Sequence, residues 1–470
     1  MVSEDITILL LPYLIGTGKL NLTDYNLVKA VRWMVGHPDV VSNLGSICYL
    51  YARIDDVEFD SDSDNSSDDL SEENENRIFI SYQKHMHLQH LLSFLPNLTS
   101  LILDLWPTDE LMTVIGQCCK NLQCFQSHTL NRHNISDSSL AMLCHCSNLE
   151  IVRFINILPG SFDSDCSKTF SKAGFAMLIL ELSKLNRLEC PEHLLRDAFQ
   201  LIHEMKFNGI LQLNFMKLHD VELPGSTVEI ISRLCPYIAI FHISVNNNEE
   251  NIIAEPLNRL ICLQQLYLRL GIGVNIQLIG LKEFGHRLKL LSLIKYGFNE
   301  SDLALINKHC FNLKILCLPR YNYDLDNADL YASLIDFNFI PKFRSLFGLK
   351  IDAKISGRLF AIMNRQMPYL RILYCTGATI DEFPAAVRDI TDHGSWSHLE
   401  VLALPEESSY EDKFLICLLG SLKNLKKLAV DLPLSSQLTV MKFISEQSLS
   451  VRTCSYSDLP DMTYISYDII

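Results

Sequence analysis

The chain has 470 residues, of which 48% are hydrophobic, so it is long enough to bury an extensive core. Its formal net charge of −15 is concentrated in residues 55–76, which hold 11 acidic side chains and no basic one; removing these 11 charges from −15 leaves −4 for the rest. This near-balance argues against a nucleic-acid-binding protein, and no stretch approaches the ~20 uninterrupted apolar residues of a membrane span.

The first 40 residues predict a mostly helical segment. An apolar run over residues 6–15 precedes a turn near Gly16 and a second helical stretch. Glu4 and Asp5 stand where a secretory signal peptide carries positive charge. We therefore expect residues 1–40 to cover one end of the fold, and we expect a soluble protein that is cytoplasmic and/or nuclear.

Residues 41–54 predict a first repeat strand, and residues 55–76 then interrupt the pattern. The second of these segments has few apolar groups and strong self-repulsion, so we expect a disordered acidic loop. Within it, Ser61 and Ser66 each have an Asp three residues later, a pattern that acid-directed kinases favour. The loop is therefore either a phosphorylation site or a solvated spacer with no regulated role.

Residues 77–470 are dominated by one recurring sequence pattern, in which an aliphatic residue, the anchor, is followed three and often five residues later by further apolar residues. A period of about 25 residues predicts a solenoid, because each unit pairs a buried strand with a helical return and must stack on its neighbours. Insertions rich in Ser, Asp and Asn over residues 160–172 and 321–329 account for two longer gaps. The predicted anchors are Leu98, Leu122, Leu149, Leu185, Ile210, Ile238, Leu263, Leu288, Leu313, Leu346, Leu370, Leu399, Leu425 and Leu449.

The cysteines follow the same repeat. The chain has 15 of them, an odd number, and Cys119, Cys146, Cys235 and Cys310 each stand three residues before an anchor. That position suits a small buried apolar residue at the end of a helix. We therefore expect reduced thiols, which favours the cytosol or nucleus.

Two stretches show the full unit most clearly. Residues 288–313 run from a strand through a turn and a helix to Cys310 and then Asn312-Leu313, and residues 135–149 end in the same way. This order resembles the cysteine-containing leucine-rich repeats of F-box proteins, over roughly residues 90–450. The resemblance implies an α/β leucine-rich-repeat solenoid, a ribonuclease-inhibitor-like horseshoe with a curved parallel sheet and outer helices. Ser136 or Ser301 is positioned to cap the helix that follows the strand.

The same resemblance raises the question of an F-box, the segment that docks on the linker subunit of a cullin-type ubiquitin ligase. The N-terminal segment holds parts of that pattern with longer spacing between them. The alternative is an N-terminal cap with no docking role. The residues that would dock are Leu11, Pro12, Leu14, Leu27, Val31 and Trp33.

No catalytic or cofactor motif is present in the sequence. Phosphate-binding glycine loops, paired metal-binding histidines and nucleophile elbows are all missing. Residues 144–146 and 118–119 are rich in Cys and His, but they lack the Cys-x-x-Cys spacing of structural zinc sites. We expect no enzyme activity, no cofactor and no metal.

The remaining candidate is a surface. Side chains alternate across a strand, so residues between the buried leucines face the concave side. Among the residues at or just beyond these positions, six Tyr, Arg or Lys residues are expected near the middle of the arc, and Tyr and Arg are enriched at interface hot spots. The predicted partner-binding residues are Tyr267, Arg269, Lys295, Arg320, Tyr321 and Tyr374.

We expect this strip to bind a protein, such as an acidic or phosphorylated segment, or the chain's own acidic loop; the alternative is an ordinary solvated face. The predicted function is a non-enzymatic protein-recognition solenoid, the substrate-binding subunit of a cullin-type ubiquitin ligase. An intracellular scaffold or inhibitor without ligase attachment is the alternative. A GTPase-activating protein would need a catalytic Arg near Arg53, directly before the acidic loop.

Overall fold

The structure is a computed structural model that carries side chains. It describes residues 19–22, 47–53, 85–104, 107–127, 135–154, 171–190, 192–222, 225–245, 253–270, 280–294, 300–318, 342–351, 355–375, 380–381, 383–393, 396–404, 411–430, 432, 434–447, 451–454 and 459. The chain forms two compact units, residues 1–216 (unit 1) and 217–470 (unit 2).

Unit 1 contains a parallel sheet in which the strands follow one another in chain order. Its strands are β1 (Lys19–Leu22), β2 (Tyr49–Arg53), β3 (Ser100–Asp104), β4 (Cys124–Ser127), β5 (Ile151–Phe154), β6 (Arg187–Glu189) and the start of β7 (Phe215–Glu222). A helical stretch over residues 85–93 follows β2 along the chain. The labelled helices are α5 (Asp109–Cys118), α6 (Asp137–Cys144), α7 (Lys172–Glu181) and α8 (Glu192–Glu204).

Unit 2 repeats the same alternation of parallel strand and helix. Its main strands are β8 (Ile240–Val245), β9 (Gln265–Leu270), β10 (Leu290–Ile294), β11 (Ile315–Leu318), β12 (Gly348–Ile351), β14 (Ile372–Cys375), β16 (Val401–Ala403), β17 (Lys427–Ala429) and β18 (Arg452–Cys454). Two short strands, β13 (Ile355–Ser356) and β15 (Ile380–Asp381), pair separately. The helices are α9 (Gly225–Leu234), α10 (Ala254–Arg259), α11 (Leu281–Phe284), the 3₁₀ turn Gly285–Arg287, α12 (Glu300–His309), α13 (Gly357–Gln366), α14 (Phe383–His393), α15 (Asp412–Ser421) and α16 (Leu434–Glu446).

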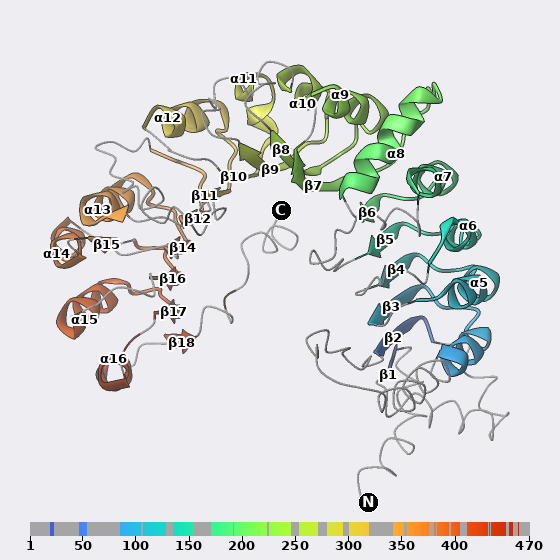
Figure 1. The fold of residues 1–470 in the computed structure, drawn as a ribbon. Coiled ribbons are helices and arrows are strands. Elements are labelled where there is room, and N and C mark those ends of the chain that lie inside the picture. Colours follow the sequence, from blue (N-terminus) through green and yellow to red (C-terminus); the bar gives the residue numbers. More distant parts are fainter. Residues whose placement is uncertain are drawn as a thin grey trace, which may run out of the picture. The chain divides into compact units, whose positions relative to one another are not determined.

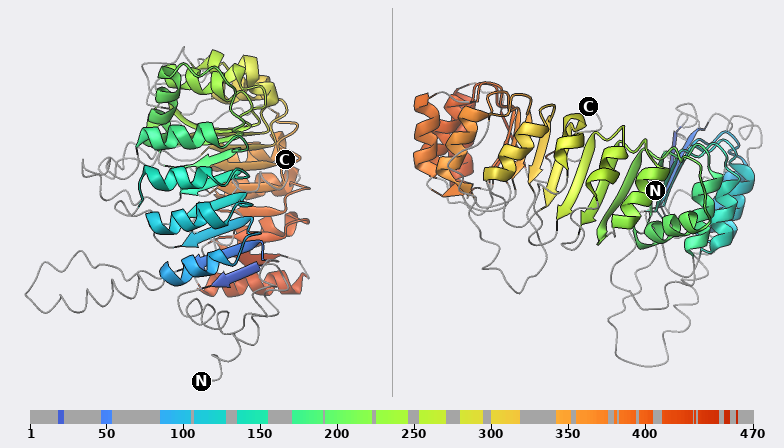
Figure 2. Two further views of the ribbon diagram at one scale, coloured as in Figure 1. Left: turned by 90° about the vertical axis from the view of Figure 1, so that its right-hand side faces the viewer. Right: turned by 90° about the horizontal axis from the view of Figure 1, so that it is seen from above.

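Within each unit the helices form a row on one side of the strands (Figure 1). In Figure 2 the same rows are seen from two further directions, with each helix beside its neighbour in the next repeat. The core lies between the sheet and the helices. In each unit, a parallel sheet with strands in chain order and helices on one side is the architecture of a leucine-rich-repeat solenoid.

The anchors form the base of this core. All of the predicted anchors except Ile210 and Leu449 are buried, none retaining more than 3% of its surface. Ile210 is the wrong residue, because it is 56% exposed and β7 begins only at Phe215. The pairing of Leu188 with Met216 places Leu213, which is 1% exposed, in the anchor register. Leu449 lies outside the described residues.

The N-terminal prediction needs one correction. Residues 19–22 form β1, which pairs with β2 in register, Leu20 opposite Leu50. The buried Leu20 therefore extends the sheet upstream of residues 41–54, within a segment that was predicted to be mostly helical and to hold no strand. The rest of residues 1–40 and the acidic loop at 55–76 lie outside the described residues, as do most of the two predicted insertions.

Neighbouring repeats of unit 1 are joined by their helix caps. Ser136 caps α6 as predicted, and its backbone N–H and hydroxyl both donate to Asp109, the first residue of α5, at 2.8 Å. Ser171 caps α7 and donates in the same way to Asp137, at 2.8 and 2.6 Å. One short segment therefore caps its own helix and bonds to the preceding one.

The cap prediction at Ser301 is wrong. Ser301 is the second residue of α12, which begins at Glu300. When the buried Leu303 is matched with Leu140 of α6, Ser301 corresponds to Ser138, two residues beyond the cap. Residues 135–149 and 288–313 are similar in composition, but Ser136 and Ser301 lie at different positions relative to the start of their helices.

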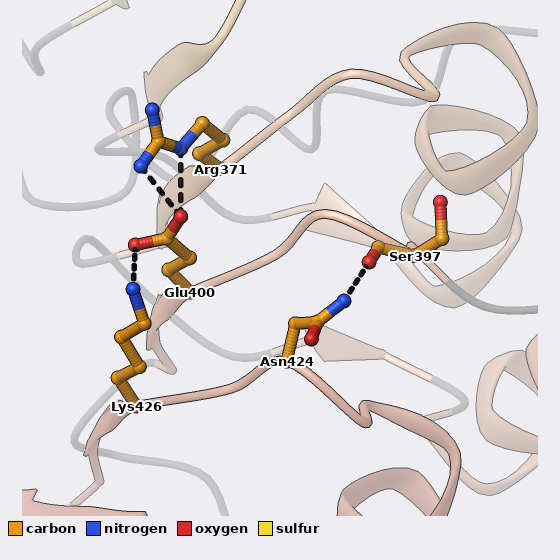
Figure 3. Close-up of polar contacts among 5 residues, drawn as sticks. All are labelled: Arg371, Ser397, Glu400, Asn424 and Lys426. Atoms are coloured by element: carbon orange, nitrogen blue, oxygen red, sulfur yellow. Dashed lines mark hydrogen bonds and ion pairs between the residues drawn. The ribbon is translucent and has the colours of Figure 1, made fainter.

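The residue just before each anchor also joins adjacent repeats. The side-chain amides of Asn121, Asn148 and Asn312 donate to backbone carbonyls of the preceding repeat, and Arg287 does so with its guanidinium. Asn424 bonds to the carbonyl of Ser397 in the same way (Figure 3). These five repeats are thus joined to the preceding repeat by hydrogen bonds that the apolar pattern alone does not reveal.

A charged ladder runs beside these bonds at the position after the anchor. Glu400 accepts hydrogen bonds from Arg371 Nε and Lys426 Nζ, both at 2.8 Å, so one carboxylate connects three consecutive repeats (Figure 3). The bond from Lys426 lowers the pKa of Glu400; burial acts in the opposite direction and is outweighed by that bond together with Arg371.

The cysteine prediction is confirmed. Cys119, Cys146, Cys235 and Cys310 are buried, and none of these four thiols is part of a disulfide. Burial raises the pKa of Cys119 and of Cys310 to about 12 each. These thiols therefore stay protonated and behave as small apolar side chains.

Candidate functional site

The candidate site is the side of each sheet that faces away from the helices, which we call the inner face. Buried core residues alternate with inner-face residues along each strand, as Leu101 and Leu103 do on either side of Ile102. Because the strands are parallel and in register, inner-face residues of successive strands form continuous rows. Each unit presents such rows, and the two units differ in what the rows contain.

The inner face of unit 1 is mixed and partly exposed. Its central row places Tyr51, Ile102, Gln126, Arg153 and Glu189 side by side on β2 to β6. All of them except the buried Gln126 keep part of their surface exposed. The row therefore combines an aromatic ring, an aliphatic side chain and charged groups, all on rigid strands.

Charged contacts organise this row. Arg153 Nε lies 2.9 Å from Glu189 Oε1 and Arg187 Nη2 lies 2.6 Å from the same atom. The Arg153 contact is an ion pair whose angle does not make a hydrogen bond from Nε, although Arg153 Nη1 donates to Gln126 Oε1 at 3.3 Å. The Arg187 guanidinium also lies over the ring of Phe215, 4.1 Å from its centroid. Two guanidinium groups on one carboxylate give this cluster a net charge of +1.

An acidic residue, Asp104 on β3, lies two strands away from Arg153 on β5. Tyr51 donates its hydroxyl hydrogen to Asp104 Oδ2 at 3.0 Å, from one strand to the next. This bond fixes the Tyr51 ring on the inner face. The unit 1 inner face thus presents a negative group at β3 and a positive cluster at β5 and β6.

The inner face of unit 2 is largely apolar. Two rows on β8 to β18 form one hydrophobic cluster, which includes Leu290, Ile315, Ile372 and Val401 in the first row and Tyr267, Cys317, Tyr374, Ala403 and Ala429 in the second. Ile315 and Leu290 have no exposed surface, and Cys317 retains 1%. These three side chains are as deeply buried as the anchors on the opposite side of the sheet.

Aromatic rings continue this cluster at its N-terminal side. His242 and Tyr267 stack across β8 and β9 with ring centroids 3.8 Å apart and planes 16° apart. Tyr267 donates its hydroxyl hydrogen to Gln265 Oε1 at 3.5 Å. The Tyr267 ring is therefore held on the sheet by its neighbours.

The structure places two of the predicted partner-binding residues, Tyr267 and Tyr374, in one inner-face row, as expected from the strand alternation. Their side chains are only 8% and 4% exposed, so they do not form an open surface. Arg269 lies at the edge of β9 and is partly exposed. Lys295, Arg320 and Tyr321 lie outside the described residues.

The other predicted positions also lie outside the described residues. They are the linker-docking residues Leu11, Pro12, Leu14, Leu27, Val31 and Trp33 and the phosphorylation candidates Ser61 and Ser66.

Sequence reasoning overlooked the apolar first row of unit 2. Leu290, Ile315, Ile372 and Val401 each stand directly before a buried strand residue. An apolar residue at that place makes the strand apolar on both sides, which is typical of a strand buried on both faces. The signal was present in runs such as Ile315 to Leu318, where all four residues are buried.

Two kinds of feature are absent from the described residues. These residues contain no group of three or more His, Cys, Asp or Glu side chains arranged to hold a metal ion. Within the same ranges, no helix has the length and apolar character needed to cross a membrane.

No protein-family model and no curated protein matches this chain. Among solved structures, a leucine-rich-repeat protein of Leptospira interrogans aligns with 88% of this chain and 86% of its own chain, at 12% sequence identity and a TM-score of 0.34.

Proposed function

We propose that this chain is a non-enzymatic protein-recognition solenoid and that the inner face of unit 1 binds its partner. The observation that carries the proposal is the partly exposed row from Tyr51 to Glu189, in which Tyr51 and Arg153 are held by neighbouring side chains, together with Arg187 of the adjoining row. Arg and Tyr supply much of the binding energy at protein interfaces, and little entropy is lost when their positions are already fixed.

The electrostatics of the row favour a partner that presents an acidic group. The cluster at β5 and β6 carries a net charge of +1, and a guanidinium group has donors for more than one acceptor. An incoming carboxylate would make charge-assisted hydrogen bonds to Arg153 or Arg187. The aromatic and aliphatic side chains of Tyr51 and Ile102 would contact apolar parts of the same partner.

The test is affinity purification of the full-length chain with mass spectrometry of the proteins that accompany it. Arg153→Ala removes an inner-face guanidinium, and Arg196→Ala on α8 is the matched control, because Arg196 lies on a helix and pairs locally with Asp197. A partner of the inner face should accompany the wild type and Arg196→Ala, and it should be depleted with Arg153→Ala. If the same proteins accompany all three chains equally, this surface is not the binding site.

We further propose that the bound protein is a substrate for a cullin-type ubiquitin ligase, with residues 1–40 docking on the linker subunit. The support is the resemblance of the repeats to those of F-box proteins and the partial motif at Leu11, Pro12, Leu14, Leu27, Val31 and Trp33. The buried thiols of Cys119, Cys146, Cys235 and Cys310 support a reducing compartment, the cytoplasm or nucleus, where such a ligase works.

Val31→Asp tests this finer proposal, with Lys29→Ala as a control in the same segment. The linker subunit should purify with the wild type and with Lys29→Ala, but not with Val31→Asp. If it accompanies none of the three, the chain is a scaffold or inhibitor without ligase attachment. The inner-face proposal would stand in either case.

A further inference from the structure

From Leu288 to Leu425 in unit 2, the residues directly after the anchors form one continuous row. The backbone N–H of each donates to the carbonyl of its counterpart in the preceding repeat, as from Lys314 to Lys289 and from Arg371 to Phe347, both at 2.8 Å. The strands that follow are in register, so these residues lie one strand spacing apart. The row, which we call the basic row, consists of Lys289, Lys314, Phe347, Arg371, Glu400 and Lys426.

The basic row carries a net positive charge. Four of its six side chains are cationic and one is a carboxylate, which leaves a formal charge of +3. The carboxylate of Glu400 is shared by Arg371 and Lys426, which bond to its two oxygens (Figure 3). Arg344 and Lys423, each two residues before an anchor, are exposed and add two further positive charges beside the row. Cations therefore gather where these strands begin.

Unit 1 shows that the fold does not need cations at this position. The same backbone ladder joins its counterparts, as from Gln123 to Thr99 and from Glu150 to Gln123, both at 2.8 Å. Of the six residues in that row, one is acidic and none is basic. They are Cys48, Thr99, Gln123, Glu150, Asn186 and Asn214. The positive charge of the basic row is therefore a property of unit 2 and not a requirement of the repeat.

Exposed aromatic rings lie beside the basic row. Phe311 is three residues before Lys314 and is 61% exposed, and Tyr369 is two residues before Arg371 and is 56% exposed. The Tyr369 ring stacks on His398 of the next repeat, with centroids 5.9 Å apart and planes 26° apart. Arg and aromatic side chains are enriched at protein interfaces. This surface therefore offers charge and apolar contact area together.

We propose that the basic row of unit 2 binds an extended acidic segment of another protein, with Phe311 and Tyr369 contacting apolar side chains of that segment. Lys and Arg make charge-assisted hydrogen bonds to carboxylates. Five spacings of ~4.8 Å between parallel strands give the row a length of about 24 Å, which about seven extended residues at ~3.3 Å each would cover. The segment would run across the strands and carry Asp or Glu at several positions. Binding here does not require the inner face of unit 1.

A protein partner fits this surface better than a nucleic acid. Glu400 lies within the basic row and its side chain is 23% exposed, so it would repel one part of a continuous phosphate backbone. The net charge of −15 on the whole chain opposes a polyanion in the same way. An acidic protein segment carries fewer charges and can place an uncharged residue opposite Glu400.

Fluorescence anisotropy with the full-length chain and labelled peptides tests the basic row. The probe is a peptide of about ten residues in which Glu alternates with Val, and a peptide with Lys in place of Glu is its comparison. The test variant carries Lys314→Gln and Arg344→Gln, both at exposed positions. The matched control carries Lys413→Gln and Arg358→Gln, which remove the same two charges from the exposed second residues of α15 and α13.

The wild type and the matched control should bind the Glu peptide equally, and they should bind the Lys peptide weakly or not at all. The test variant should bind the Glu peptide roughly fivefold to tenfold more weakly, because two exposed charge contacts are lost. Its thermal unfolding should match that of the wild type, since both substitutions are at exposed positions. Arg153→Ala, on the inner face of unit 1, should bind the Glu peptide as the wild type does.

Failure of the wild type to bind the Glu peptide would overturn the proposal. Equal weakening in the test variant and in the matched control would also overturn it, because net charge and not the basic row would then attract the peptide. Weakening by Arg153→Ala alone would place the peptide on unit 1 and leave the function proposed for that face standing. Tighter binding of a single-stranded oligothymidine of similar length, lost in the test variant, would make the basic row a nucleic-acid site instead.

Discussion

At the scale of single residues, Asp109 is the polar side chain that most clearly joins two repeats. It accepts hydrogen bonds from Ser136 N, Ser136 Oγ and Ser139 Oγ, all from the next repeat. Burial acts to raise the pKa of Asp109, but the bonds from Ser139 and Ser136 outweigh it and leave the pKa below the ordinary value of 3.8. The carboxylate form therefore favours the folded state.

Asp109→Asn should lower the free energy of unfolding by about 1–2 kcal/mol at neutral pH, because the amide has one acceptor oxygen instead of two and no charge. The difference from wild type should shrink as the pH falls below about 4, where Asp109 is protonated in the unfolded chain, and it should be lost once the pH passes below the lowered pKa of Asp109 in the folded protein. Urea unfolding followed by circular dichroism measures both. Glu110→Gln, at the exposed neighbouring position, is the control and should have little effect at any pH.

Glu400 makes a similar number of contacts but should matter less. Its partners Arg371 and Lys426 are 56% and 65% exposed, so solvent screens both ion pairs. Glu400→Gln should lower the free energy of unfolding by less than about 1 kcal/mol, and the loss should largely disappear in about 1 M salt. Urea midpoints at low and high salt test this. A salt-independent loss as large as that of Asp109→Asn would contradict the assignment.

At the scale of helices and strands, two glycines in the last turns of helices differ in what surrounds them. A Cβ on Gly116 of α5 would collide with the backbone carbonyl of Met142 in α6. A Cβ on Gly420 of α15 would meet only Phe443 Cζ, at 3.7 Å. The close approach of α5 and α6 therefore depends on Gly116, whereas α15 tolerates a larger residue.

Gly116→Ala should destabilise the protein by about 2 kcal/mol or more, because backbone cannot move aside as a flexible side chain can. Gly420→Ala should stabilise it by about 0.5–1 kcal/mol, because alanine is the better helix former. Thermal unfolding of the two variants and of the wild type measures both changes in stability. Equal effects of the same sign would show that helix propensity, and not packing between repeats, controls these positions.

The sequence predicted the anchors correctly where the apolar residues match the repeat in only one alignment. It predicted them less well where two alignments match. Leu288 and Leu313 have a single alignment, and both are buried anchors. Near β7, Ile210 and Leu213 are three residues apart, so the repeat pattern matches with either as the anchor. The register of Leu188 with Met216 selects Leu213. Inter-repeat bonds such as Ser171 to Asp137 could not be predicted, because they depend on how closely the repeats stack.

At the scale of the whole molecule, the inner-face positions were predictable and their exposure was not. Strand alternation placed Tyr267 and Tyr374 in one row, as the structure confirms. Their burial depends on what packs over the sheet, and Leu459, which packs against this cluster, lies far from both in the sequence. The unit 1 cluster of Arg153, Arg187 and Glu189 was likewise only partly predictable, since Arg187 and Glu189 lie on a strand of three residues.

Recognition is therefore proposed to take place on the inner face of unit 1. Hydroxyl-radical footprinting of the full-length chain, alone and with the partner that depends on Arg153, is the most direct test. Tyr51 and Cys124 are partly exposed on this face, whereas Met86 is exposed on the helical stretch at residues 85–93. Binding should reduce oxidation of Tyr51 and Cys124 and leave Met86 unchanged. Protection of Met86 with no change at Tyr51 and Cys124 would place the partner on the helices and contradict the account.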